Sequence, residues 1–281
     1  PRTASLMRRA MMKKYGLTAI ALCLVSFYLF PLYWMYNTAL KSGTEIFANP
    51  PTFWPENPQW MVGEVWTRLK MDVYLWNSLL IASGVTIIVA ICGTGCAYVL
   101  SRIRNRWMDV VLFIVLMMQV LPSSLMITPI FVAFNQVGLN EVPRTSVILA
   151  QAAKVLPLYI VLCRATFLQV PRELEEAALV DGNSRIGAFL SIIVPLARNG
   201  ILVTSVLIFL QSFGEYVYSR SLITQRALQP ATVGLQSFMG PNTSDWSGVM
   251  TYSAIYVTPV LIIFVLLQRQ IVSGLTSGAL K

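Results

Sequence analysis

The sequence contains no histidine and few charged residues, since Asp, Glu, Lys and Arg together make up 12% of its 281 positions. Without histidine, the chain cannot build the usual zinc site of a membrane peptidase or use the most common general base. No pair of aspartates lies within an apolar run, and no G-x-x-x-x-G-K-[ST] phosphate loop is present. These absences argue against an intramembrane enzyme and against a phosphate-loop ATP site in this chain.

Cysteine is also scarce, and all four cysteines lie in apolar runs: Cys23, Cys92, Cys96 and Cys163. This placement implies no disulfide framework. Cys92 and Cys96 share a helix face at i, i+4 and could begin a metal site, but no acidic residue lies in that window. Gly93 and Gly95 make the same segment a small-residue surface, so we expect close helix packing instead of a metal.

Apolar residues dominate what is present: 56% of the chain is hydrophobic and its mean hydropathy is +0.65. A helix needs about 20 residues to cross a hydrocarbon core of about 30 Å. Six windows are long and apolar enough: 17–40, 76–100, 108–134, 146–168, 200–218 and 250–268. We therefore predict an all-α polytopic membrane protein, one domain over residues 1–281, with six transmembrane helices. The first window is too long for a cleaved signal peptide, so we expect it to remain as an anchor.

The net charge of +9 does not indicate nucleic-acid binding, because the basic residues are dispersed along the chain. Relative to the apolar windows, most of them fall on one side: at the N-terminus, at 101–106, around 171–198 and at the C-terminus. By the positive-inside rule, both termini and the connection between the fourth and fifth windows are expected to be cytoplasmic.

That connection, residues 171–195, reads PRELEEAALVDGNSRIGAFLSIIVP and is unusually polar. Pro171 suits the first helical position, glutamates follow in the first turns where the helix dipole favours anions, and Gly182 can adopt a left-handed C-terminal conformation. We predict a short helix over residues 171–181. Its apolar face is narrow and shallow, as suits a groove on another protein.

A second helix is expected to follow, capped by Asn183 or Ser184 and running toward Val194, before Pro195 turns the chain back to the bilayer. The alternative is a helix pair lying on lipid headgroups. Such helices usually carry Lys and Arg on their polar face, whereas this segment opens with three glutamates that anionic headgroups would repel. The sequence therefore favours a protein partner over the membrane surface.

At these residues the sequence resembles a known family. The positions match the EAA signature of permease subunits in binding-protein-dependent ATP-binding-cassette (ABC) importers: Glu176, Ala177, Ala178, Gly182, Ile192 and Pro195. One position departs, because Val194 stands where leucine is usual. The wider loop, the AYVLSRIRNRW turn, QVLP at 119–122 and the tail QRQIVSGLTSGALK are similar to the carbohydrate-uptake branch and its smaller maltose-type permease subunit.

The resemblance implies that the loop is a coupling helix seated in a cleft of an ATPase subunit. The implied coupling residues are Glu175, Glu176, Ala177, Ala178, Asp181, Gly182, Ile192 and Pro195. It also implies a tail that contacts the ATPase pair: Gly274, Leu275, Thr276, Ser277 and Gly278. The implied partners are a sister permease, two ATPase subunits that carry ATP and Mg, an extracytoplasmic solute-binding protein and the lipid of a bacterial inner membrane. No cofactor or metal is expected in this chain itself.

Polar residues within or beside the apolar windows are candidates for a translocation path: Gln119, Gln151, Lys154, Gln211 and Glu215. A charge at the centre of a spanning helix costs about 2.5 to 3.5 kcal/mol, so such residues usually have a function. Lys154, one turn from Gln151, could line a polar cavity or snorkel to the outer surface. Glu215 could line an outer gate or pair with a base, and Gln119 could line the path or join two helices.

We expect the permease to import a sugar or a related solute. A disaccharide, an oligosaccharide, an acidic glycan and a glycerol phosphodiester all remain open, and Lys154 favours an anionic ligand slightly. A secondary transporter that needs no ATPase is the alternative from another class. It should show an inverted internal repeat and more intramembrane charge, and the sequence has no convincing repeat.

Overall fold

The computed structural model describes residues 2–68, 70–103, 105–239 and 245–276. The secondary-structure elements within these residues are all helices. The chain divides into two compact units, Pro1–Leu69 with Ser237–Val257, and Lys70–Gln236 with Thr258–Lys281. Five helical segments are long and apolar enough to cross a membrane: Lys14–Ala39, Met71–Arg102, Pro143–Phe167, Arg185–Phe213 and Trp246–Gln270. They contain or overlap five of the six predicted windows.

The prediction of one continuous helix over 108–134 is wrong. The structure has α5 (Arg106–Met117), a short 3-10 turn η1 (Met118–Val120) and a separate helix α6 (Ser123–Gln136). Pro122 has an extended backbone, with φ −61° and ψ 136°, and precedes the first residue of α6. A proline donates no backbone hydrogen bond and disfavours helical geometry in the residue before it, so the QVLP stretch interrupts the helix.

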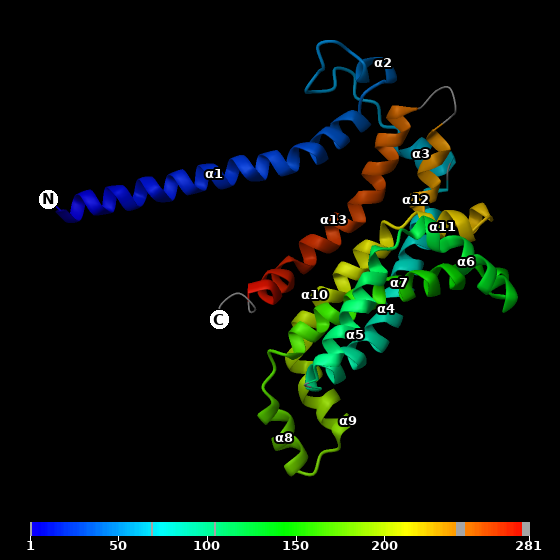
Figure 1. The fold of residues 1–281 in the computed structure, drawn as a ribbon. Coiled ribbons are helices and arrows are strands. Elements are labelled where there is room, and N and C mark those ends of the chain that lie inside the picture. Colours follow the sequence, from blue (N-terminus) through cyan, green and yellow to red (C-terminus); the bar gives the residue numbers. More distant parts are fainter. Residues whose placement is uncertain (1, 69, 104, 240–244, 277–281) are drawn as a thin grey trace. The chain divides into compact units, whose positions relative to one another are not determined.

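Three long helices form the core of the larger unit: α4 (Met71–Arg102), α7 (Pro143–Phe167) and α10 (Val194–Phe213). They pack side by side, as Figure 1 shows. Gly93 permits this packing, because a Cβ there would lie 2.4 Å from Cδ1 of Tyr159. Tyr159 is fully buried, and its hydroxyl lies 2.8 Å from Oγ1 of Thr94. The close helix contact predicted for this small-residue surface is confirmed at Gly93, whereas a Cβ at Gly95 would meet nothing within 4 Å.

The smaller unit contains α1 (Arg2–Ala39), α2 (Gly43–Ile46), α3 (Val62–Arg68) and the beginning of α13 (Trp246–Thr276). Side-chain hydroxyls of α13 tie it to the end of α1. Thr251 Oγ1 donates to the carbonyl of Ala39 at 3.1 Å, and Ser247 Oγ donates to the carbonyl of Lys41 at 3.1 Å. These contacts order the start of the first long loop.

The polar loop after α7 forms α8 (Arg172–Val180) and α9 (Arg185–Ala188), which protrude from one end of the larger unit in Figure 1. The turn predicted at Pro195 is wrong. A π-helical segment, η3 (Phe189–Ile193), runs directly from α9 into α10, and the Val194 N–H donates to the carbonyl of Phe189. The wider π turn precedes the proline, whose ring would clash with the carbonyl four residues earlier in a regular helix, so the helix continues.

Short elements cover the opposite end of the larger unit: η2 (Leu139–Glu141), α11 (Val217–Leu222), η4 (Arg226–Leu228) and α12 (Ala231–Gly234). The chain passes from the larger unit to the smaller one within η5 (Leu235–Phe238). The fifth window was predicted over 200–218, but α10 ends at Phe213 and the chain turns before α11 begins. The segment around η4 is bound to α4 through Asn77, whose Nδ2 donates to the carbonyls of Ala227 and Gln229, both at 2.9 Å.

Candidate functional site

The protruding loop begins with the helix that the sequence predicts. Residues 171–181 were expected to form it, and α8 spans Arg172–Val180, with Pro171 and Asp181 as its flanking cap residues. Glu173 and Glu175 lie in its first turn, where the partial positive charge of the helix end favours carboxylates. Local sequence alone therefore accounts for the position and length of this helix.

Gly182 ends α8 in the left-handed conformation that was predicted for it, with φ +88°. The Asn183 N–H donates to the carbonyl of Ala178 at 2.9 Å, and the Gly182 N–H donates to the carbonyl of Leu179 at 3.1 Å. This pair of bonds is a Schellman motif, which satisfies the last carbonyls of a helix. Ser184 then caps α9, its Oγ accepting the Gly187 N–H at 3.0 Å. The turn is thus fixed by backbone geometry.

The helix α8 has two distinct faces. Ala178 is 5% exposed and packs inward, one turn from the half-buried Glu175. The outward residues follow the helical spacing i, i+3, i+4, i+7, and all are exposed: Glu173, Glu176, Ala177 and Val180. The two adjacent glutamates of the signature therefore have different surroundings, because Glu175 faces the chain itself and Glu176 faces outward.

Glu175 binds two side chains of α4. Its Oε2 lies 2.9 Å from Nε of Arg102, and its Oε1 accepts a hydrogen bond from the Tyr98 hydroxyl. The Glu175 and Arg102 side chains are 17% and 15% exposed. Arg102 also donates through Nη1 to the carbonyls of Phe167 and Val170, at 3.4 and 3.3 Å, and so reaches the end of α7. The carboxylate of Glu175 is thus fully engaged within the chain.

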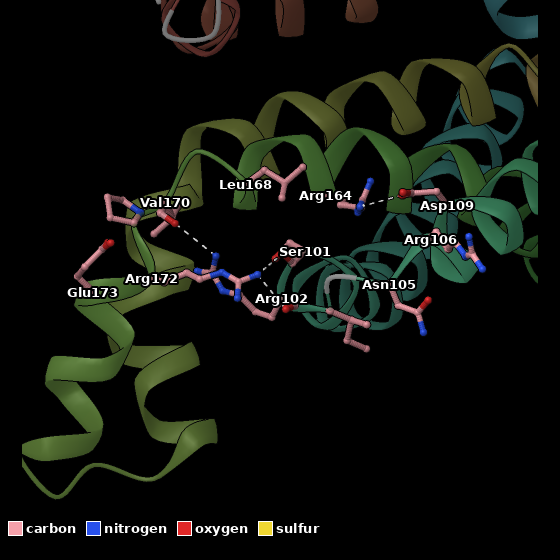
Figure 2. A pocket seen from close by; sticks show the side chains of 12 residues that line it. Ser101, Arg102, Asn105, Arg106, Asp109, Arg164, Leu168, Val170, Arg172 and Glu173 are labelled. Carbon is pink, nitrogen blue, oxygen red and sulfur yellow. Dashed lines mark hydrogen bonds and ion pairs between the residues drawn. The ribbon is translucent and has the colours of Figure 1, made fainter.

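A cavity of about 580 Å³ lies beside this network, among the ends of α4, α5, α7 and α8. Figure 2 shows its arginines, with Arg102 and Arg172 near Ser101, and Arg164 paired with Asp109 at 3.1 Å. Arg172 donates to the carbonyls of Ser101 and Arg102, at 3.3 and 2.8 Å. Arg102, Arg164 and Arg172 therefore bind backbone carbonyls at helix ends or carboxylates of neighbouring helices. These bonds stabilise the helix ends and hold them together.

On both sides of Gly182 the loop exposes apolar side chains. Val180 is 86% exposed, Ile186 72% and Leu190 60%. Ile192, by contrast, is half-buried in the π segment and packs against the core, and Pro195 is exposed in the first turn of α10. The exposed apolar residues and the outward face of α8 together present a mixed apolar and acidic surface.

The predicted tail is described only in part. Gly274, Leu275 and Thr276 form the last residues of α13, whereas Ser277 and Gly278 lie outside the described residues. The expectation that this tail contacts an ATPase stays a prediction.

At the other end of the larger unit, Gln151 and Glu215 come together. Gln151 is 2% exposed, and its Nε2 donates to Oε2 of Glu215 at 3.0 Å, while its Oε1 accepts the Ser212 hydroxyl. Glu215 also caps α11, accepting the Tyr218 N–H at 2.7 Å and the Ser219 N–H at 3.1 Å. This carboxylate therefore links α7 to α11, and Gln151 extends the network to Ser212 of α10. Among the described side chains bonded to the carboxylate, none is basic.

Lys154 lies one turn further along α7, against the break between α5 and α6. Its Nζ donates to the Ser123 hydroxyl and lies 5.9 Å from the ring centre of Tyr218. Gln119, in the same break, donates through Nε2 to the carbonyl of Lys154. The structure thus joins four of the five path candidates in one region and leaves out Gln211, which is exposed on α10. The Lys154 amine is turned toward protein groups of the broken helix.

Sequence reasoning missed the partners of these residues. Tyr98 and Arg102 belong to the AYVLSRIRNRW turn, which was interpreted as a basic topology signal and as part of the resemblance to the carbohydrate-uptake branch. Ser123 follows QVLP without any notable pattern. A tyrosine and an arginine four residues apart share one face of a helix. That spacing was the available signal, but nothing local indicates which loop they would bind.

Long apolar helices, a polar cluster beside a broken helix and a protruding helix–glycine–helix loop define a polytopic membrane permease. Residues 90–277 match the family described as binding-protein-dependent transport system inner membrane component, and the chain belongs to this family. It is therefore an ABC importer permease of the sugar-transport type, as the resemblance of its loop predicted.

Relatives match along almost the whole chain. The trehalose/maltose transport system permease protein of Thermococcus litoralis is 31% identical, over 98% of this chain and 99% of its own length. The diacetylchitobiose uptake system permease protein of Streptomyces coelicolor is 29% identical, over 98% of this chain and 100% of its own. The sulfoquinovosyl glycerol transport system permease protein of Agrobacterium fabrum is 28% identical, over 90% of this chain and 89% of its own.

The fold is also that of a solved importer. A chain from the crystal structure of a bacterial ABC transporter involved in the import of the acidic polysaccharide alginate superposes with a TM-score of 0.73. It is 19% identical, and the match covers 92% of this chain and 96% of that one. At this identity the likeness establishes the shared fold.

Proposed function

We propose that this chain forms, with a sister permease, the translocation path for a sugar delivered by an extracytoplasmic binding protein, and that two ATPase subunits drive it through α8. The observation that carries the proposal is that the two adjacent glutamates of α8, Glu175 and Glu176, have different surroundings. Glu175 is bound inside the chain, whereas Glu176 stands exposed beside Val180 on a rigidly capped helix. A short helix that presents a carboxylate and apolar side chains suits a basic-rimmed groove on another protein.

The proposal includes both termini in the cytoplasm and a sixth membrane crossing made by α5, η1 and α6 together. The excess of basic residues at the termini and near α8 supports the orientation. A broken helix is tolerated at membrane depth where it is buried in protein or lines a cavity. Ser123 and Gln119, both at the break, contact α7, so the interruption lies against the neighbouring helix. ATP and Mg would be held by the partner subunits.

The substrate contacts are proposed at the break itself. Discontinuous helices in transporters commonly mark the solute path. Lys154, Ser123 and Gln119 place an amine, a hydroxyl and an amide there, groups that bind sugar hydroxyls or carboxylates. A neutral sugar is the leading class. An acidic glycan is the second candidate, which the Lys154 amine supports, and relatives and neighbours include proteins named for sulfoquinovosyl glycerol and alginate.

The test of the motor contact is Glu176→Lys in the complex purified with its sister permease and ATPases. We expect reversal of this exposed charge to reduce ATPase retention and uptake by at least about tenfold, because like charges across an interface cost several kcal/mol and each step of about 1.4 kcal/mol is a factor of ten. Glu176→Gln, which removes charge without reversing it, should have a smaller effect. Full uptake and full substrate-stimulated ATP hydrolysis in the Glu176→Lys complex would show that α8 is not the mechanical link.

A further inference from the structure

Three side chains at the connection between α8 and the long helix α4, Tyr98, Arg102 and Glu175, form a network that we call the Glu175 node. Arg172 of α8 bonds separately to the backbone of α4, donating to the carbonyls of Ser101 and Arg102. One carboxylate binds both partners, with its two oxygens divided between the Tyr98 hydroxyl and the Arg102 guanidinium. Both charged side chains are more than four-fifths buried. A charge pair held in this way resists displacement, because separating it would leave a buried charge unpaired.

The Glu175 node also reaches the end of α7 and the π segment that leads into α10. The ring of Tyr98 lies 4.6 Å from that of Phe189, which begins the π segment leading into α10, and 5.8 Å from that of Phe167 at the end of α7. Arg102 donates to two carbonyls at the same end of α7. A displacement of α8 is therefore felt beyond Glu175, since this residue contacts side chains that pack against the end of α7 and against the π segment before α10.

A second ion pair at the same end of the molecule offers a comparison. Arg164 and Asp109 join α7 to α5 at 3.1 Å, and Asp109 is 67% exposed. Among the described residues, the Glu175–Arg102 pair joins α8 to a long apolar helix, whereas the Arg164–Asp109 pair does not involve α8. Breaking one pair or the other therefore distinguishes two effects: loss of an ion pair between helix ends in general, and loss of the attachment of α8 to α4.

We infer that Tyr98 and Arg102 are positioning residues that fix α8 to α4, so that a movement imposed on α8 is transmitted to α4 and to the start of α10. The inference rests on the proposed function, because it takes α8 as the element that the ATPase moves. It gives the Arg102 turn a mechanical role in addition to its contribution to topology. It also assigns separate tasks to the two glutamates, Glu176 to the motor and Glu175 to the membrane helices.

The test uses the complete complex in proteoliposomes, with uptake and ATP hydrolysis measured in the same sample. Glu175→Gln and Arg102→Met should each lower the amount of sugar transported per ATP hydrolysed by about tenfold, within the usual range of coupling between sites. The double variant should lose less than the two single effects combined, because both substitutions remove the Glu175–Arg102 pair. Tyr98→Phe keeps the ring on Phe189 and removes only the hydroxyl, so it should have a smaller effect and no effect on assembly.

Asp109→Asn is the matched control, since it breaks the other ion pair and should leave the transport ratio unchanged. The amount of ATPase bound to each complex should equal that of the parent for the node variants. If Glu175→Gln and Tyr98→Phe transport as much sugar per ATP hydrolysed as the parent, whatever amount of complex is purified, the inference is overturned. If Glu176→Lys uncouples the complex and these variants do not, the inference alone fails; if Glu176→Lys also has no effect, the proposed function fails.

Discussion

Lys154 is the residue whose chemistry bears most directly on the substrate. Its amine contacts Ser123 and the Tyr218 ring at the helix break, although a charged amine there is costly to bury. If it faces the solute path, Lys154→Met should raise the substrate concentration needed for half-maximal uptake by about tenfold, because a hydrogen bond to a charged group contributes about 1.5 kcal/mol or more. Uptake by reconstituted complex, measured over a range of substrate concentrations, checks this.

Lys154→Arg keeps the charge and should retain most of the affinity. Assembly with the sister permease should be unaffected, since methionine preserves the length of the side chain. Identical uptake curves for Lys154→Met and the parent, at subsaturating and saturating substrate, would show instead that the Lys154 amine does not contact the transported solute.

Gly182 is the residue on which the shape of the loop depends. No atom lies within 4 Å of an added Cβ, so a substitution there suffers only from the left-handed backbone, with φ +88°. We expect Gly182→Val to reduce coupled uptake, since a side chain in this conformation costs about 1 to 2 kcal/mol and the Schellman turn would loosen. Gly182→Asn should be milder, because asparagine tolerates this region. Equal uptake by the Val and Asn variants would contradict a conformational role.

At the scale of elements, prediction from the sequence succeeded where local interactions decide. The ends of α8 follow from Pro171, the early glutamates and Gly182, all within one short segment. It failed at 108–134, where apolarity alone suggested one helix, and at Pro195, where a π turn keeps the helix continuous. In both cases a proline was present, and whether it breaks a helix depends on how the neighbouring backbone accommodates it.

The contact between α4 and α7 gives a prediction about stability. A Cβ at Gly93 would lie 2.4 Å from the Tyr159 ring, whereas one at Gly95 meets nothing within 4 Å. Gly93→Ala should therefore destabilise the permease by about 1 to 3 kcal/mol through overpacking. Gly95→Ala, on the same helix, should be neutral or slightly stabilising. Thermal unfolding of the two variants in detergent makes the comparison, and equal midpoints would mean that Tyr159 moves aside freely.

At the scale of the whole molecule, the sequence indicated the family and the loop but not how distant residues meet. Glu175 was expected to face the ATPase with Glu176, yet its partners lie 77 and 73 positions earlier in the chain, at Tyr98 and Arg102. Likewise, Gln151 and Glu215 were separate candidates until the fold placed their amide and carboxylate 3.0 Å apart. Such pairings depend on how α4, α7, α8 and α10 pack, which no local pattern specifies.

The complete complex provides the last prediction, which concerns the class of substrate. With its cognate binding protein, the reconstituted complex should hydrolyse ATP faster when the transported solute is present, and we expect stimulation by a neutral oligosaccharide. If Lys154 instead selects an anion, acidic glycans should stimulate more strongly, and Lys154→Met should reduce that stimulation more than stimulation by neutral sugars, because the amine pairs with the opposite charge of the anion in addition to donating a hydrogen bond. If no glycan changes the rate at which the ATPase subunits of the complex hydrolyse ATP, sugar import is contradicted altogether.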